Sequence, residues 1–163
     1  VIHVQVVPGP QFKLMLVAKG GGCENRSKYK MLTPADGMEG AKEWILECIR
    51  TAGPDACPPL IAGVGIGGTF EKAALLSKKA LFRELGSPNP DPTVDAIEKE
   101  VLDRANRLGI GPQGLGGDPT AFAVHVELAA THITMNPVAV NIQCHSARRA
   151  TAVFTPEGIE IGV

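Results

Sequence analysis

The chain has 163 residues and a formal net charge of −1, from 16 basic and 17 acidic side chains, so its overall charge does not favour a nucleic-acid partner. Aromatic residues make up only 4% of the sequence, which argues against stacking platforms for single-stranded nucleic acid. No apolar run reaches the length of about 18 residues typical of a membrane-spanning helix, and no signal peptide is recognisable, so no membrane partner is expected. The length suits a single domain, residues 1–163, with a sizeable core.

The cysteines, Cys23, Cys48, Cys57 and Cys144, are few and widely spaced. No pair has the Cys-x-x-Cys spacing of a zinc ribbon or a thioredoxin-type site. Because the chain is neither short nor rich in cysteine and shows no secretory signal, we expect reduced thiols and a cytoplasmic location.

The first elements in chain order are two apolar, alternating segments, residues 2–7 and 13–18, separated by two prolines and a glycine. This pattern predicts a strand, a turn and a strand. Three consecutive glycines follow at residues 20–22. Their backbone freedom favours a loop that turns its N–H groups toward a small ligand, and a plain flexible loop is the alternative.

Three main helices are predicted in the middle of the chain. Asp36 and Glu39 have the spacing of a capping box, and an apolar stripe that includes Cys48 continues the helix until Gly53. Cys48 is therefore expected in the core. The second helix is predicted over residues 70–85, and the third runs from about residue 92 to Gly109.

Residues 60–66 form a short apolar run that predicts a strand, and Gly63, Gly65 and Gly68 have the spacing of a dinucleotide-binding fingerprint. The second strand of such a unit, with its ribose-binding acid, does not follow, because the proline-rich residues 87–92 open another helix. A nucleotide-binding module is therefore only a distant alternative. Glycines that let a helix pack closely on a sheet are the preferred interpretation.

The last third of the chain predicts strands over residues 122–128 and 138–142 and a hairpin from residues 151–154 and 159–163. With the three helices, these strands predict an α/β fold with a mixed sheet. His132 falls in a turn-like segment before the strand 138–142, and Cys144 comes directly after that strand, where a side chain is well placed for chemistry. The alternative is a buried cysteine beside a surface basic cluster.

Six short motifs carry a family resemblance: AKGGG at residues 18–22, CPP at 57–59, GVGIGGT at 63–69, GPQGLGG at 111–117, ATHI at 130–133 and NIQCH at 141–145. Together they resemble the α-subunit, or N-terminal catalytic domain, of the iron–sulfur class I fumarate hydratases and L(+)-tartrate dehydratases. The resemblance covers nearly the whole chain. The combination is specific, although each glycine motif alone is common.

The resemblance implies a hydro-lyase that reversibly hydrates fumarate to malate in the tricarboxylic acid cycle, with L(+)-tartrate dehydration as the alternative. In this family three cysteines hold a [4Fe–4S] cluster, whose fourth iron polarises the substrate as a Lewis acid. Cys57 and Cys144 match two of these ligands. His132 matches the family's substrate-binding histidine and is the catalytic candidate, and Gly21 matches a backbone position near the substrate.

The chain also departs from the family pattern. The upstream Cys-Gln-Asp-Thr-Gly segment with the third ligand is absent from residues 1–163, so we expect the C-terminal portion of the α-subunit catalytic domain, inactive by itself. The general base is expected on the β-subunit or C-terminal domain, the main partner beside a C4 dicarboxylate substrate, and a homo-oligomer is also expected. Cys23 stands where relatives usually have serine. Arg148 and Arg149 are interpreted as solvated surface and not as a dianion clamp.

Overall fold

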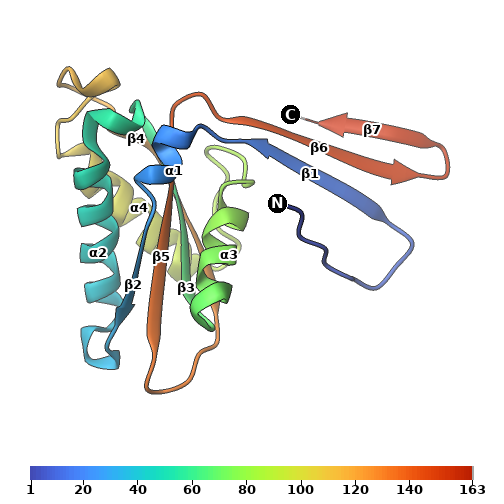
Figure 1. Ribbon diagram of the computed structural model, residues 1–163, viewed down its shortest axis with the longest axis horizontal. Coiled ribbons are helices and arrows are strands. Elements are labelled where there is room, and N and C mark those ends of the chain that lie inside the picture. Colours follow the sequence, from blue (N-terminus) through green and yellow to red (C-terminus); the bar gives the residue numbers. More distant parts are fainter. Residues whose placement is uncertain (163) are drawn as a thin grey trace. The chain divides into compact units, whose positions relative to one another are not determined.

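A computed structural model describes residues 1–162, which divide into two compact units (Figure 1). The larger unit is Lys19–Ala147, and the smaller combines the two ends of the chain, Val1–Ala18 and residues 148–162. None of the helices in the described residues is long and apolar enough to cross a membrane.

The larger unit is built on a mixed sheet. In spatial order its described strands are β2 (Lys28–Leu32), β5 (Asn136–Gln143), β3 (Leu60–Gly67) and β4 (Ala121–Ala129). β5 runs antiparallel to both of its neighbours, whereas β3 and β4 are parallel. Every residue of β3 is buried, as expected for a central strand covered on both faces. The predicted α/β class with a mixed sheet is confirmed.

The three predicted helices are present as α2 (Gly37–Ala52), α3 (Phe70–Ala80) and α4 (Pro92–Asn106). Apolar residues of α2 and α4 form one core with the alternate β3 residues Ala62, Val64 and Ile66. The other face of β3 packs against α3. Because strand side chains alternate between faces, α3 covers one side of the sheet while α2 and α4 cover the opposite side (Figure 1).

Gly63 and Gly65 lie inside β3, beneath α3. A Cβ on Gly63 would collide with the carbonyl oxygen of Ser77, and one on Gly65 with that of Ala73. The absence of side chains at these two positions therefore lets the helix approach the strand closely. Neither glycine lies in an open phosphate-binding turn, so their positions agree with the packing interpretation of the glycine fingerprint.

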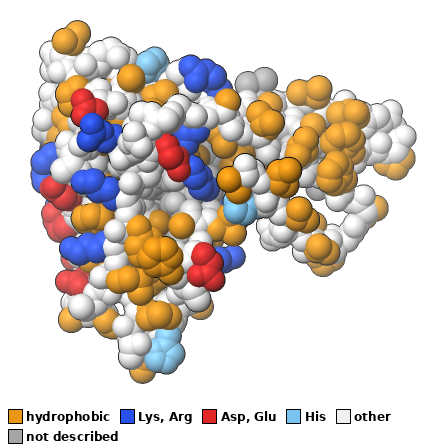
Figure 2. Space-filling view, in the orientation of Figure 1, with side chains coloured by type: hydrophobic (Ala, Val, Ile, Leu, Met, Phe, Trp, Pro, Cys, Tyr) orange, Lys and Arg blue, Asp and Glu red, His pale blue; other side chains and the backbone are white. Residues whose placement is uncertain are grey.

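The smaller unit is an antiparallel sheet whose described strands are, in spatial order, β1 (Phe12–Ala18), β6 (Arg148–Thr155) and β7 (Gly158–Gly162). The predicted C-terminal hairpin of residues 151–154 and 159–163 is confirmed as far as residue 162, although β6 begins earlier, at Arg148, and the expectation for residue 163 lies outside the described residues. One face of this sheet is apolar: Phe12, Leu14, Leu16, Ala150, Ala152, Phe154, Ile159 and Ile161. Leu14 is 50% exposed and Ile161 77%, and Figure 2 shows hydrophobic side chains gathered over these strands.

Several predicted boundaries are wrong. Residues 2–7 form no strand, because nothing buries them to offset the entropy of ordering an extended chain. The capping box lies one turn earlier than expected, between Thr33 and Asp36. α3 ends at Ala80 and not near residue 85, because residues 81–85 form turns. The glycine loop is a short helix, α1 (Gly21–Asn25), and β2 was not predicted.

Candidate functional site

Cys57 lies where the helical region ends and the sheet begins. A short 3-10 helix, Gly53–Ala56, continues from α2, and Cys57 follows it in a left-handed conformation with φ of 52°. Such a conformation is uncommon for a residue with a side chain and is concentrated at functional positions. Two prolines come next and lead directly into β3, so the exposed Cys57 sits on a fixed backbone at the N-terminal end of the central strand.

Cys144 comes directly after β5 and lies at the same end of the sheet, because β5 runs antiparallel to β3. The N–H of His145 donates to the carbonyl oxygen of Cys57 at 3.3 Å, and His145 Nδ1 lies 3.1 Å from that oxygen. The fold thus places next to one another the two cysteines that the sequence singled out. Cys144 is 9% exposed, whereas Cys57 is an exposed residue.

The second glycine-rich loop, residues 111–117, packs against the end of the sheet where Cys57 and Cys144 lie, which we call the cysteine corner. The N–H of Gln113 donates to the carbonyl oxygen of Pro58 at 2.9 Å, and Gln113 Nε2 lies 3.3 Å from His145 Nδ1. Gly114 packs directly on Pro54, where a Cβ would collide with the proline ring. Gln113 was missed as a site residue in the sequence, since only folding brings it to the cysteines.

Helix α1 forms another wall of this corner. Gly21 is its first residue, with open space where a Cβ would stand. Cys23 is buried, and its thiol donates to the carbonyl oxygen of Ala56 at 3.6 Å, one residue before Cys57. Burial raises the pKa of the Cys23 thiol, and contact with the Cys144 thiol raises it further. Three of the four cysteines therefore gather at one end of the sheet.

A charged cluster accompanies α1. Lys19 and Lys78 both donate to the Glu24 carboxylate, and only 7% of the Lys19 side chain is exposed. Burial lowers the pKa of Lys19, although its hydrogen bond to Glu24 opposes the shift. Burial alone would raise the pKa of Glu24, but the two lysines outweigh that effect and lower it. The sequence offered one signal for this cluster, the lysine directly before the glycines.

The end of β5 contains polar groups in unusual surroundings. The oxygens Asn141 Oδ1 and Gln143 Oε1 are buried without a hydrogen-bond partner. Gln143 is only 2% exposed and directly precedes Cys144. An unsatisfied buried acceptor is energetically costly, so these two oxygens make the end of β5 an unusually polar part of the interior.

His132 lies far from these cysteines. Its loop follows β4, where the hydroxyl of Thr131 donates to the carbonyl oxygen of Gly68 at 2.8 Å, just past the end of β3. Thr134 binds His132 Nδ1 through its hydroxyl at 2.8 Å. His132 and Cys144 flank the two ends of β5, an eight-residue strand that spans roughly 23 Å. One copy of the chain does not bring His132 to Cys144.

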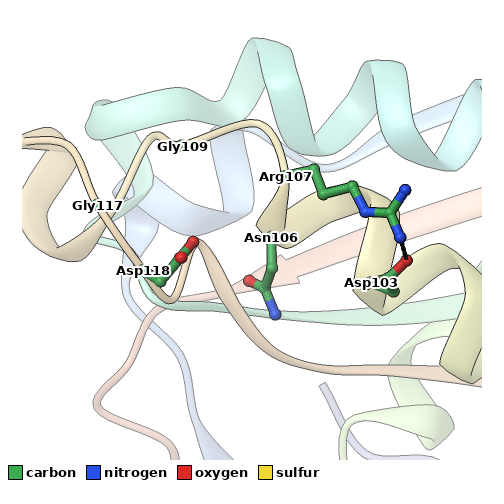
Figure 3. A pocket seen from close by; sticks show the side chains of 6 residues that line it. All are labelled: Asp103, Asn106, Arg107, Gly109, Gly117 and Asp118. Atoms are coloured by element: carbon green, nitrogen blue, oxygen red, sulfur yellow. Dashed lines mark ion pairs between the residues drawn. The ribbon is translucent and has the colours of Figure 1, made fainter.

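A separate hollow of about 340 Å³ lies beside the C-terminal end of α4 (Figure 3). Its polar side chains have structural roles: Arg107 pairs with Asp103 at 2.6 Å, and Asn106 Oδ1 accepts from the N–H groups of Thr120 and Ala121. Gly109 and Gly117 supply only backbone to the wall. The residues that line the hollow include none of the predicted site residues, Gly21, Cys57, His132 and Cys144.

The chemistry of the cysteine corner fits thiolate coordination. Cys57 and Cys144 are free thiols, and the residue after Cys144, His145, is hydrogen-bonded to the backbone of Cys57. Thiolates are the usual ligands of iron–sulfur clusters. Within residues 1–162, however, no three His, Cys, Asp or Glu side chains form a set that could hold a metal ion. The two thiols fit part of such a site and need at least one more ligand.

The fold and this corner define an α/β domain that offers part of a thiolate site at one end of its sheet. The family model described as fumarate hydratase (fumerase) matches residues 1–153. The putative L(+)-tartrate dehydratase subunit alpha of Methanocaldococcus jannaschii is 47% identical over 140 residues, which are 86% of this chain and 49% of that protein. The chain belongs to the fumarate hydratase family.

Two further relatives come from Escherichia coli. The L(+)-tartrate dehydratase subunit alpha of strain UTI89 is 42% identical over 147 residues, 90% of this chain and 48% of that protein. The protein of the same description from strain K12 is 44% identical over 132 residues, 81% of this chain and 44% of that protein. The chain thus spans about half the length of the curated relatives it matches.

Proposed function

We propose that the chain is part of a hydro-lyase that reversibly hydrates fumarate to malate, and that Cys57 and Cys144 bind two irons of a [4Fe–4S] cluster. The observation that carries the proposal is the direct backbone hydrogen bond from His145 to Cys57, which places the two thiols at one end of the sheet. The third thiolate comes from a part of the α-subunit outside residues 1–163. When bound, the cluster supplies a Lewis acid for the substrate hydroxyl.

The residues of this chain have separate roles in the proposal. Cys57 and Cys144 are the metal ligands. The N–H of Gly21, among the first donors of α1, binds a substrate oxygen, because the first N–H groups of a helix have no intrahelical acceptor. His132 holds a carboxylate of the substrate or steers a proton. Since His132 and Cys144 lie at opposite ends of β5, that histidine belongs to a second copy of the chain.

The proposed enzyme needs a partner. The relatives are named as alpha subunits, which supports a β-subunit or C-terminal domain that contributes the general base. Residues 1–163 would then be the C-terminal portion of the α-subunit catalytic domain in a homo-oligomeric, cytoplasmic enzyme of the tricarboxylic acid cycle. Co-expression of the full-length α-subunit with its β-subunit, followed by affinity purification of one, should recover both.

Replacement of the ligands tests the cluster. In the full-length enzyme, reconstituted without oxygen, we expect Cys57→Ser and Cys144→Ser each to lower bound iron and sulfide by at least half and to abolish hydration of fumarate. The matched control is Cys48→Ala, which removes a thiol buried in the core. An unchanged cluster content in both ligand variants would refute the assignment.

L(+)-tartrate is the second candidate substrate, because the relatives described above are named L(+)-tartrate dehydratase subunit alpha. Fumarate and tartrate differ in the hydroxyl groups that the site must recognise, and residues 1–162 contain only part of that site. Steady-state kinetics of the complete enzyme with fumarate, malate and L(+)-tartrate separates the two activities. The substrate with the highest kcat/KM identifies the enzyme.

A further inference from the structure

Cys23 and Cys144 are neighbours although 120 other residues separate them in the sequence. The hydroxyl oxygen of Ser27, just after α1, accepts from the N–H of Ile142 at 3.1 Å and fixes the end of α1 to β5. Cys23 lies one helical turn before Ser27, and Cys144 lies two residues beyond Ile142. The chain runs antiparallel to β5 here, as the pairing of Lys28 with Val140 shows, so both cysteines lie on the same side of that bond.

The two thiols also influence one another electrostatically. The Cys144 thiol adds to the effect of burial in raising the pKa of Cys23, and both residues are free and buried, at 5% exposure for Cys23 and 9% for Cys144. The remaining contact of Cys23 is with a carbonyl oxygen, that of Ala56, and the thiol of Cys144 lies 3.9 Å from the carbonyl oxygen of Ser146. A thiol is a weak hydrogen-bond donor, so both contacts are weak.

The other cysteines are placed differently. Cys48 is fully buried in the core cluster between α2 and the sheet. Cys57 is exposed and meets bulk solvent, where a thiol reacts with any accessible partner. Cys144 is the more exposed member of the buried pair, so a small oxidant reaches it first and Cys23 is the thiol beside it.

We propose that Cys23 and Cys144 form a reversible dithiol–disulfide pair that hydrogen peroxide oxidises. The sulfur of Cys144 attacks one peroxide oxygen, the O–O bond breaks, and a sulfenic acid and one water form. The sulfur of Cys23 then displaces the hydroxyl group as a second water, and the S–S bond forms. Two thiols lose two electrons and two protons in total, and one peroxide becomes two waters.

The pair has a consequence that rests on the proposed function. A disulfide withdraws the Cys144 sulfur from metal binding, so the oxidised chain cannot supply both of its thiolates to a cluster. A thiol reductant restores the site without new synthesis, which distinguishes this modification from irreversible oxidation to the sulfonic acid. Cys23 thereby protects Cys144 while the cluster is absent.

The test uses the full 163-residue chain with Cys57→Ser, so that the exposed thiol cannot join two chains. After reduction, brief exposure to hydrogen peroxide and alkylation in denaturant, peptide mapping by mass spectrometry should find Cys23 joined to Cys144 within one chain. Cys48 should be the only alkylated thiol, and dithiothreitol should restore the other two.

The matched variant is Cys23→Ser with Cys57→Ser, whose circular dichroism should be unchanged. There Cys144 should be trapped as a sulfenic acid by dimedone and should progress to the sulfinic acid. A disulfide between Cys48 and Cys144, or irreversible oxidation of Cys144 while Cys23 is present, would overturn the proposal. These readouts need no cluster, so they remain valid if the proposed hydro-lyase function fails.

A second arm tests the link to the cluster in the full-length apo α-subunit. Peroxide treatment before anaerobic reconstitution should lower iron uptake severalfold in the unmodified protein, and dithiothreitol should restore it. Cys23→Ser should lose iron uptake irreversibly under the same treatment. If the disulfide forms and iron uptake is unaffected, the pair stands and its proposed effect on the cluster is wrong.

Discussion

The thiols of Cys48 and Cys57 differ in their exposure to solvent and therefore in their expected reactivity. Burial raises the pKa of Cys48 to about 12, from 9.0 for an ordinary thiol, whereas Cys57 is exposed. Because the thiolate is the reactive form, Cys48 should stay unmodified by iodoacetamide at pH 8 while Cys57 reacts fully. Time-resolved mass spectrometry of the native chain checks this order. Equal rates would mean that α2 opens from the sheet during labelling.

Single residues also show what the sequence could and could not predict. Cys57 and Cys144 were identified because proline pairs, strand ends and a family motif mark them locally. Cys23 and Gln113 meet these cysteines only through contacts between distant segments, for which one sequence gives no pattern. Lys19 stands in the AKGGG motif, but its pairing with Glu24 was not predicted, since the burial of its side chain depends on how α1 folds.

At the level of elements, the contact between α3 and β3 depends on glycine. Gly65→Ala places a Cβ against the carbonyl oxygen of Ala73, so helix and strand must separate. We expect a loss of about 1–3 kcal/mol in the free energy of unfolding, measured by urea titration. Gly21→Ala is the control, because a Cβ there meets open space and alanine favours a helix. A Gly65→Ala variant as stable as the control would contradict this account of the packing.

Helices and buried strands were predicted well because the pattern of apolar residues within each segment indicates its structure. The apolar stripe of α2 and the uninterrupted apolar run of β3 need no partner to be recognised. Residues 2–7 show the opposite case: their alternation is typical of a strand, but a strand persists only where it is paired and covered. The sequence did not predict α1 because this helix begins with glycines, which are poor helix formers.

At the level of the whole molecule, the distance between His132 and Cys144 makes the assembly testable. Full-length His132→Ala and Cys144→Ser enzymes should each be inactive as pure assemblies. If a histidine from one copy serves the cluster of another, co-expression of the two variants with different tags should restore part of the activity in doubly purified hybrids. Hybrids that stay inactive would show that one copy must supply both residues.

The strands of the smaller sheet come from segments far apart in the sequence, which affects the order in which the chain folds. β1 is made early, but its partner β6 begins only at Arg148, and their first pair is Ala18 with Arg148. Contacts between residues so far apart form slowly, because the intervening chain must be ordered first. Folding of Lys19–Ala147 closes this long loop, so the terminal sheet should assemble last. Until then β1 remains an unpaired apolar strand, and nascent chains are most vulnerable to aggregation and chaperone capture at that stage.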